Sequence, residues 1–358
     1  MSARQDRVVS ARAGVRFGPF GMLVRRRAAL WGVGVVAVLV GTTLFAVFTG
    51  TLDLPASRVW ATLLGEGSRV DELVVIDRRL VRAVVAVLVG FVLGLSGALT
   101  QTVTRNPIAT PDLLGVTAGA SAAAVLVITQ PWLVETITGT ATVSLVAPAA
   151  IAGGLLTTAA IVGLAWRGGF DGMRLVLVGL GVNAIALALV SWGLMRADLE
   201  SAAVATRWLT GSLSGVRTAD LWLLLPVVVL AAACSVVLSR DLGALRLGRD
   251  VAASLGTRPA RAEAYAVALA VVAVSAATAV AGPIGFVAFV APQAALRLFG
   301  TAGPTPLAAG LVGAAVVLVS DQAAQRLPVE LPVGVVTAVI GAPALMFLLI
   351  RYVRRTSV

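Results

Sequence analysis

The 358-residue sequence contains no lysine and no histidine, and its only cysteine is Cys234. Without lysine there is no phosphate-binding P-loop, so this chain does not hydrolyse ATP by that route. Without histidine the usual zinc, haem and triad constellations are missing, and one cysteine cannot form an internal disulfide. These absences predict that the chain is not an enzyme and carries no metal site or cofactor of its own.

Charged residues are also scarce, at 13% of the chain, whereas 59% of the residues are hydrophobic and the mean hydropathy is +0.98. Such values exclude a water-soluble globular domain. A membrane span needs about 20 predominantly apolar residues. Runs of suitable length predict an all-α, polytopic membrane protein of about ten transmembrane helices, at residues 28–49, 81–103, 113–130, 142–165, 174–195, 219–239, 262–281, 284–300, 305–325 and 332–352.

The arginines indicate how the chain is oriented. A basic cluster precedes the first apolar run, and basic flanks stay in the cytoplasm. An even number of spans returns the C-terminal arginines to the same side, so we expect both termini there. The predicted organisation is an arginine-rich cytoplasmic tail at residues 1–27 and one ten-helix membrane domain at residues 28–358.

Proline and glycine interrupt several of the predicted spans. Backbone groups freed at membrane depth are tolerated only where protein or a water-filled pathway covers them, so such breaks are typical of transporters. Asn183 lies in mid-span, where its amide either clamps a neighbouring helix or lines a pathway. The predicted pathway and gating positions are Asn106, Pro107, Asn183, Gly282, Pro283, Gly285, Pro292, Pro332 and Gly334.

A pair of arginines lies at the predicted outer mouth of the second span. Arg79 and Arg82 are three residues apart, so on a helix they share one face. They either anchor the helix in the membrane interface or offer forks for the carboxylates of an external partner. The outer loop that precedes them is predicted to hold a short amphipathic helix around Arg58–Leu64.

The predicted cytoplasmic segment 239–261 alternates charged and apolar residues. Leu247, Val251 and Leu255 keep a spacing of four, which predicts one shared helical face. This face is either that of an ordinary interfacial helix or a docking surface for another cytoplasmic subunit.

Several motifs run in order through most of the chain: Arg79-Leu80-Val81-Arg82, Leu95-Ser96-Gly97-Ala98, Arg105-Asn106-Pro107, Pro111-Asp112-Leu113-Leu114-Gly115-Val116, Trp208-Leu209-Thr210-Gly211-Ser212-Leu213-Ser214-Gly215, Gly282-Pro283-Ile284-Gly285-Phe286-Val287 and Glu330-Leu331-Pro332-Val333-Gly334-Val335-Val336-Thr337. Together they closely resemble the iron-siderophore/vitamin B12 permeases of ABC importers, the FecCD-type family. Only the arginine-rich N-terminal tail lies outside the resemblance.

The resemblance implies a permease of the type II ABC importer fold in a bacterial inner or cytoplasmic membrane. It implies a second permease subunit, two cytoplasmic ATPase subunits that hold ATP and Mg, and an extracytoplasmic binding protein that delivers the cargo. By the same resemblance, Arg79, Arg82 and Arg326 face the binding protein. The ATPase-coupling positions are Arg246, Leu247, Gly248, Arg249, Asp250, Ser254, Leu255 and Gly256.

The chain departs from the family pattern at two places. The commonest motif in the eighth span is Pro-His, but here it is Pro292-Gln293, which occurs in the branch resembling ferric-enterobactin permeases. Val81 replaces the proline between the two arginines. The departures favour a ferric siderophore as cargo and make a heterodimer of permeases plausible. The alternatives are a cobalamin or haem importer of the same fold, or an ion-coupled secondary transporter.

Overall fold

The computed structural model describes residues 14–17, 20–23, 26–50, 52–132, 145–165 and 172–356. Within these described residues, seven helical segments are long and apolar enough to cross a membrane: α1 (Arg26–Phe48), the continuous segment Arg69–Thr104, α7 (Val146–Ala165), the part Leu177–Arg196 of α8 (Gly172–Arg196), α10 (Thr218–Val237), α13 (Pro259–Ala281) and α15 (Pro306–Ala324). Three shorter apolar stretches lie in α5 (Val116–Thr129), α14 (Val287–Phe299) and α16 (Val333–Thr356). These segments coincide with the ten predicted runs, which confirms the all-α polytopic fold.

Short elements connect the spans. α2 (Ala56–Leu63) is the predicted amphipathic helix, and α3 (Arg69–Glu72) and the π-helical η1 (Leu73–Leu80) lead directly into α4 (Val81–Thr104). The 3-10 turn η2 (Pro111–Leu114) precedes α5, and α9 (Leu199–Leu209) follows α8. α11 (Ser239–Leu245) and α12 (Arg249–Ser254) join α10 to α13.

The predicted N-terminal tail is described only in part. Within it, β1 (Gly14–Phe17) and β2 (Phe20–Leu23) pair as a short antiparallel hairpin with Gly14 opposite Leu23. Residues 1–13, 18–19 and 24–25 lie outside the described part of the chain, and the cytoplasmic location of the whole tail stays a prediction.

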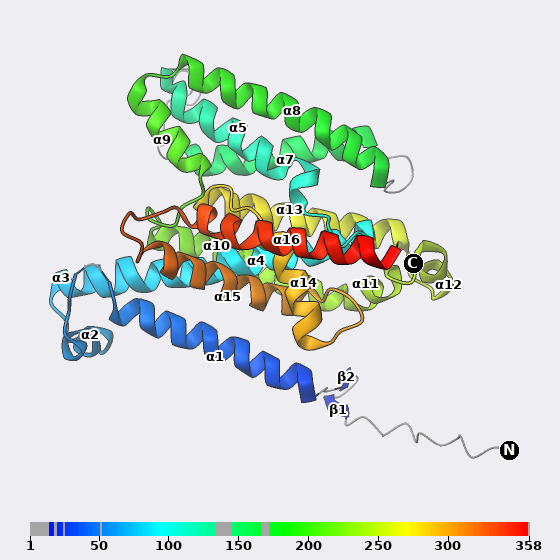
Figure 1. Cartoon of the computed structure of the whole chain (residues 1–358), viewed down its shortest axis with the longest axis horizontal. Helices are drawn as coiled ribbons and strands as arrows, with labels where there is room; N and C mark the ends of the chain where they lie inside the picture. The colour runs from blue at the N-terminus through cyan, green and yellow to red at the C-terminus, as the bar shows by residue number, and fades with distance from the viewer. Residues whose placement is uncertain are drawn as a thin grey trace.

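The helices lie roughly parallel in a layered bundle, with α5, α7 and α8 on one side, α1 on the other and α4, α10, α13, α15 and α16 between them (Figure 1). We call its two ends the α2–α3 end and the α11–α12 end. α4 is the central helix, since it packs against α10, α13, α14 and α15. Its contact with α15 is close because Gly90 and Gly313 face each other, and a Cβ on either would overlap the carbonyl oxygen of the other. Small residues permit this approach where helices pack without a hydrophobic driving force.

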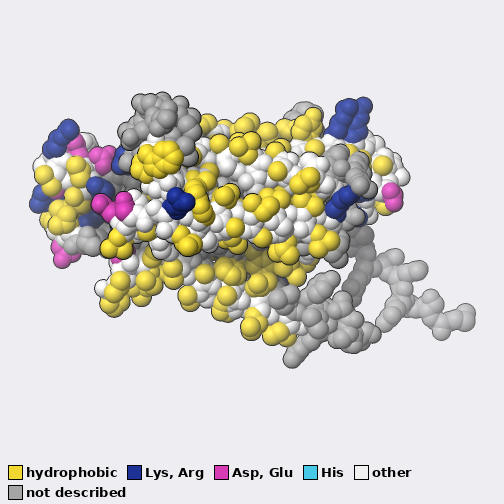
Figure 2. All heavy atoms as spheres, turned by 90° about the horizontal axis from the view of Figure 1, so that it is seen from above, with side chains coloured by type: hydrophobic (Ala, Val, Ile, Leu, Met, Phe, Trp, Pro, Cys, Tyr) yellow, Lys and Arg dark blue, Asp and Glu magenta, His cyan; other side chains and the backbone are white. Residues whose placement is uncertain are grey.

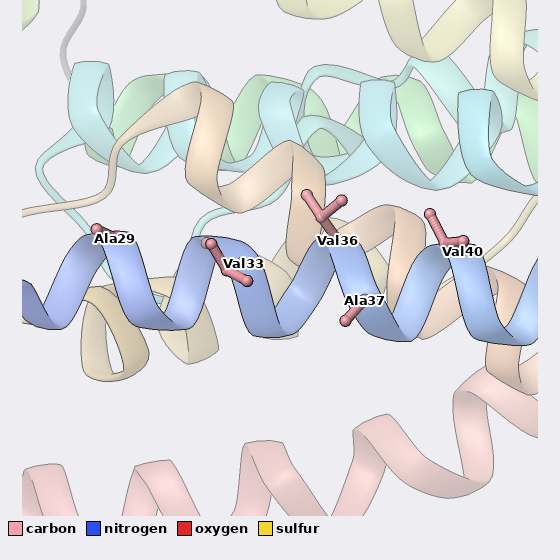
Figure 3. A pocket seen from close by; sticks show the side chains of 6 residues that line it. Ala29, Val33, Val36, Ala37 and Val40 are labelled. Atoms are coloured by element: carbon pink, nitrogen blue, oxygen red, sulfur yellow. The ribbon is translucent and has the colours of Figure 1, made fainter.

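Charged side chains gather mostly at the two ends of the molecule, whereas its flank is covered largely by hydrophobic and uncharged side chains (Figure 2). Leu180 on α8 and Val339 on α16 are among the large apolar side chains that are exposed. In addition, an apolar groove of about 610 Å³ runs along α1, lined by Ala29, Gly32, Val33, Val36, Ala37 and Val40 (Figure 3). Surfaces of this kind suit contact with lipid chains.

Candidate functional site: a glycine junction between two polar ends

Three chain breaks meet inside the bundle. Gly211 follows α9, Gly282 follows α13 and Gly334 lies in the first turn of α16. The Gly334 amide donates to the Gly211 carbonyl at 3.0 Å, and the Ser212 amide donates to the Ala281 carbonyl at 2.8 Å. Backbone groups that the breaks remove from helices therefore satisfy each other, as an apolar surrounding requires. We call Gly211, Gly282 and Gly334 the glycine junction.

No larger residue fits at the glycine junction. A Cβ at Gly282 would overlap the Trp208 carbonyl oxygen, and one at Gly334 would overlap the Thr210 carbonyl oxygen. Gly211 and Gly282 also have φ of +69° and +68°, in the left-handed region that glycine adopts without steric cost. The sequence indicated Gly282 and Gly334 as gating positions, whereas Gly211 entered only as part of the family motif at residues 208–215. Its contact across 71 residues of chain (282 − 211) leaves no local signal.

Between Gly282 and α14 the chain turns sharply. Phe286 adopts a left-handed φ of +67°, and a Cβ at Gly341 of α16 would overlap the Phe286 side chain. Pro283 lies beside Gly334, whereas Gly285 is exposed. Pro292, expected as a helix break, lies inside α14, which continues to Phe299. Its missing amide removes one helical hydrogen bond without ending the helix. The break therefore lies before α14.

A buried pair of amides joins the central helix to α14. Gln293 Nε2 donates to Gln101 Oε1 at 2.8 Å, and Gln101 Nε2 reaches the Phe289 carbonyl at 3.4 Å. Both glutamines are nearly inaccessible. In low-dielectric surroundings such a matched pair fixes the relative position of two helices. Gln293 was singled out in the sequence as a departure from Pro-His, but its pairing with Gln101 was not predicted.

The other predicted breaks lie apart from the glycine junction. Asn106 and Pro107 are exposed in the turn after α4, where Asn106 Oδ1 accepts from the Ile108 amide at 3.0 Å. Pro332 precedes α16 and is partly buried. Asn183 Nδ2 on α8 contacts the Asp112 carbonyl at 3.4 Å, while its Oδ1 is buried without a hydrogen-bond partner in the described residues. Of the two interpretations of Asn183, the clamp between helices is the one with an observed contact.

The α2–α3 end carries the predicted arginines, and each already has partners within the chain. Arg79 donates to the carbonyls of Val47, at 3.0 Å, and Leu52. Arg326 donates to Gln322 and to Thr49, and its guanidinium lies 4.2 Å from the centroid of the Phe45 ring.

Arg82 has the most complete set of partners of the three arginines. Its Nε and Nη2 lie 2.9–3.2 Å from the buried Asp321 carboxylate, and its Nη1 lies 3.1 Å from Glu330 Oε1. Arg79, Arg82 and Glu330 line a cavity of about 220 Å³ that opens at this end. The cavity is therefore rich in guanidinium donors and holds a carboxylate of its own.

At the α11–α12 end the predicted coupling positions divide into two groups. Leu247, Asp250, Ser254, Leu255 and Gly256 are exposed, as is Val251 between them. Exposed leucine and valine side chains on a segment with this many charges are compatible with both predicted roles, an interfacial helix and a docking surface.

The remaining coupling positions face the bundle. Arg246 donates to the Pro304 carbonyl, and burial lowers the pKa of its guanidinium. Gly248, with φ of +108°, makes the turn into α12. Arg249 pairs with the buried Glu263 of α13. Glu263 was not identified from the sequence, because a single glutamate near a predicted helix end has no distinguishing pattern.

Comparisons with known proteins find one family that matches most of the chain. The FecCD transport family matches residues 38–351. The ferric enterobactin transport system permease protein FepG of Escherichia coli is 37% identical over 334 residues, which is 93% of this chain and 99% of that protein. The cobalamin import system permease protein BtuC of Halobacterium salinarum is 34% identical over 317 residues, which is 87% of this chain and 84% of that protein.

A solved structure has the same fold. It is an inward-facing conformation of a metal-chelate type ABC transporter, and it matches with a TM-score of 0.78 at 26% sequence identity. The match covers 90% of this chain and 99% of that one.

Proposed function

The chain belongs to the FecCD transport family, and from this premise we propose that it is the permease subunit of an ATP-driven importer of ferric siderophores. The observation that carries the proposal is the glycine junction, where the chain after α9, the chain after α13 and the first turn of α16 are joined by backbone hydrogen bonds. Segments that are held together by a few such bonds can separate and rejoin with a small change in free energy. A gate in an alternating-access transporter needs this property.

The cargo in this proposal is a complete iron chelate rather than the bare ion. The sequence has no histidine and one cysteine, so its own side chains offer few of the groups that bind transition metals. A siderophore already satisfies the coordination of its iron. The permease then needs a passage that binds weakly, and it needs no metal site.

The partners follow from the two polar ends. We place an extracytoplasmic binding protein at the α2–α3 end, where Arg79 and Arg82 line the cavity and Arg326 donates to two of its other lining residues. We place ATPase subunits at the α11–α12 end, against Leu247 and its neighbours. ATP and Mg would bind to the ATPase subunits. A second permease, identical or homologous, completes the pathway. Both termini lie on the cytoplasmic side of a bacterial inner membrane in this arrangement.

The substrate is tested by uptake. Cells with and without this gene are given radio-iron on hydroxamate, catecholate and mixed-ligand siderophores, with labelled cobalamin alongside. We expect loss of uptake for one siderophore class and full restoration by the wild-type gene. Loss of cobalamin uptake alone would instead identify the chain as the permease of a cobalamin importer. The similarity to the relative from Halobacterium salinarum supports this second candidate.

The energy source is tested separately from the substrate. Uptake into proteoliposomes that hold the assembled complex is measured with internal ATP, and then with a proton or sodium gradient and no ATP. An importer of the proposed kind depends on ATP and on the partner ATPase. Gradient-driven uptake without ATP would instead establish an ion-coupled secondary transporter.

A further inference from the structure

A buried carboxylate lies next to the proposed ATPase-facing segment. Glu263 sits in the second turn of α13, and only 4% of its side chain is exposed. One oxygen, Oε1, lies 3.4 Å from Arg249 Nε, while Oε2 is buried without a hydrogen-bond partner in the described residues. A buried acid is costly unless it is paired, and ionisable groups at such positions in membrane proteins usually serve a function.

Two arginines from different elements act on this carboxylate. Arg249 is the first residue of α12 and is 34% exposed, so it lies between Glu263 and the surface. Arg105 ends α4 in a left-handed conformation and interacts electrostatically with Glu263. The Arg105 guanidinium also borders the turn into α12, since a Cβ at Gly248 would lie 3.9 Å from its Nη1. α12 and α13 thus meet at this carboxylate, and Arg105 brings a positive charge near it from the end of α4.

We infer that Glu263 is a positioning residue that transmits movement of α12 to α13 and α4. The inference rests on the proposed function, in which ATPase subunits move α12. α13 runs without interruption from Pro259 to Ala281 and ends at the glycine junction. From Glu263 to Gly282 is 19 residues (282 − 263), or roughly 28 Å at 1.5 Å per residue. A shift of α13 at its Glu263 end therefore reaches the junction through a rigid helix.

The geometry explains why a charge pair suits this link. Leu247, Val251 and Leu255 are exposed, so these side chains are free to contact a partner rather than α13. Hydrogen bonds between a guanidinium and a carboxylate are directional, so an arginine–glutamate pair fixes both the distance and the orientation of α12 relative to α13. The unused Oε2 can accept a hydrogen bond from a second guanidinium. When α12 moves and Arg249 withdraws, Arg105 can therefore pair with Glu263, so the carboxylate stays paired before and after the movement. This exchange keeps α4, α12 and α13 linked through the cycle.

The test uses the complete importer in proteoliposomes, with permeases, ATPase subunits, binding protein and cargo. Glu263→Gln keeps the shape of the side chain and removes its charge. We expect ATP hydrolysis and subunit assembly to stay near wild type while uptake per ATP falls about tenfold or more, a size typical of coupling between sites. Glu200→Gln, an exposed acid on α9 at the opposite end, is the matched control and leaves both quantities unchanged.

A double variant separates transmission from simple stability. Arg249→Gln together with Glu263→Gln leaves neither charge uncompensated, so thermal stability should recover toward wild type. Uptake per ATP should stay as low as in Glu263→Gln alone. Recovery of uptake together with stability, or unchanged uptake per ATP in Glu263→Gln, would overturn the inference. A wild-type complex without any ATP-dependent uptake would instead count against the proposed function.

Discussion

Arg82 and Asp321 form a buried fork between α4 and α15. The Arg82 Nη2–Asp321 Oδ1 distance is 2.9 Å, and the Asp321 side chain is fully inaccessible while that of Arg82 is 17% exposed. Nε reaches the same carboxylate, so two of the three guanidinium nitrogens are committed to one partner. The pair thus fastens the central helix to α15, and it leaves only Nη1 for other contacts.

The first prediction concerns this fork. Arg82→Ala should destabilise the protein by roughly 3–5 kcal/mol, because it leaves the Asp321 charge buried without compensation. Arg82→Lys should restore stability only in part, because an ammonium cannot make the two-pronged contact. The measurement is thermal unfolding in detergent. Arg78→Ala, an exposed neighbour in the same cavity, is the control and should change stability by less than about 1 kcal/mol. An equal loss of stability in Arg82→Ala and Arg78→Ala would contradict the role of the Arg82–Asp321 pair in fastening α4 to α15.

The second prediction concerns Glu330, which occupies Arg82 Nη1 at 3.1 Å and is 54% exposed. If a binding-protein carboxylate docks on Arg82, it must displace Glu330. Glu330→Gln should therefore tighten docking by about two- to fivefold, the range expected for an exposed ion pair. The measurement is binding-protein affinity for the reconstituted complex at fixed salt. Glu66→Gln, another exposed acid at this end, serves as control. Weaker docking would mean that Glu330 orients Arg82 instead of competing for it.

The third prediction concerns the glycine junction. Gly282→Ala places a methyl group on the Trp208 carbonyl and forces an unfavourable φ, so the segments cannot approach as they do here. Uptake should fall below about a tenth of wild type, corresponding to more than 1.4 kcal/mol. Gly163→Ala on α7, where no atom lies within 4 Å of the added Cβ, should have no effect. The measurement is radio-iron uptake by cells that express the two variants at matched levels. Uptake at the wild-type rate by Gly282→Ala would show that the glycine junction is not part of the transport mechanism.

The fourth prediction concerns the exposed apolar side chains Leu247, Val251 and Leu255. Replacing all three by serine should weaken ATPase assembly at least about tenfold, since burying each such side chain contributes about 1.5–3 kcal/mol at most. The measurement is the amount of ATPase that copurifies with the permease. Permease stability should not change, because these side chains are exposed in the isolated chain. Leu199→Ser, at the opposite end, should leave assembly intact.

The spans and their ends were predictable because their signals are local. A run such as 262–281 is apolar over its whole length, and α13 occupies Pro259–Ala281. The amphipathic pattern around Arg58–Leu64 likewise corresponds to α2. Lipid offers no hydrogen-bond partners to the backbone, so a long apolar segment must pair its own N–H and C=O groups and forms a helix. Pro292 shows where a local signal misleads, because one proline inside α14 does not end the helix.

Contacts between distant segments were not predictable in this way. Arg82 and Arg326 were identified as docking residues from a family resemblance, but nothing in the sequence indicated that Asp321, Glu330 and Gln322 already bind them. Asp321 and Glu330 are 239 and 248 residues away from Arg82 in the sequence. Such pairings depend on which faces of which helices meet, and this is set by packing of the whole bundle.

Hydropathy, proline positions and the absence of histidine and lysine can be read without knowing the fold. From them alone the sequence predicts about ten membrane spans, several broken helices and no chemistry through histidine or lysine. The contacts of Gly211 with Gly282 and Gly334, of Gln101 with Gln293 and of Glu263 with Arg249 depend instead on how the whole chain folds. The physical reason is that a buried polar group needs a partner, and the partner is chosen by proximity in the folded chain and not by neighbouring residues.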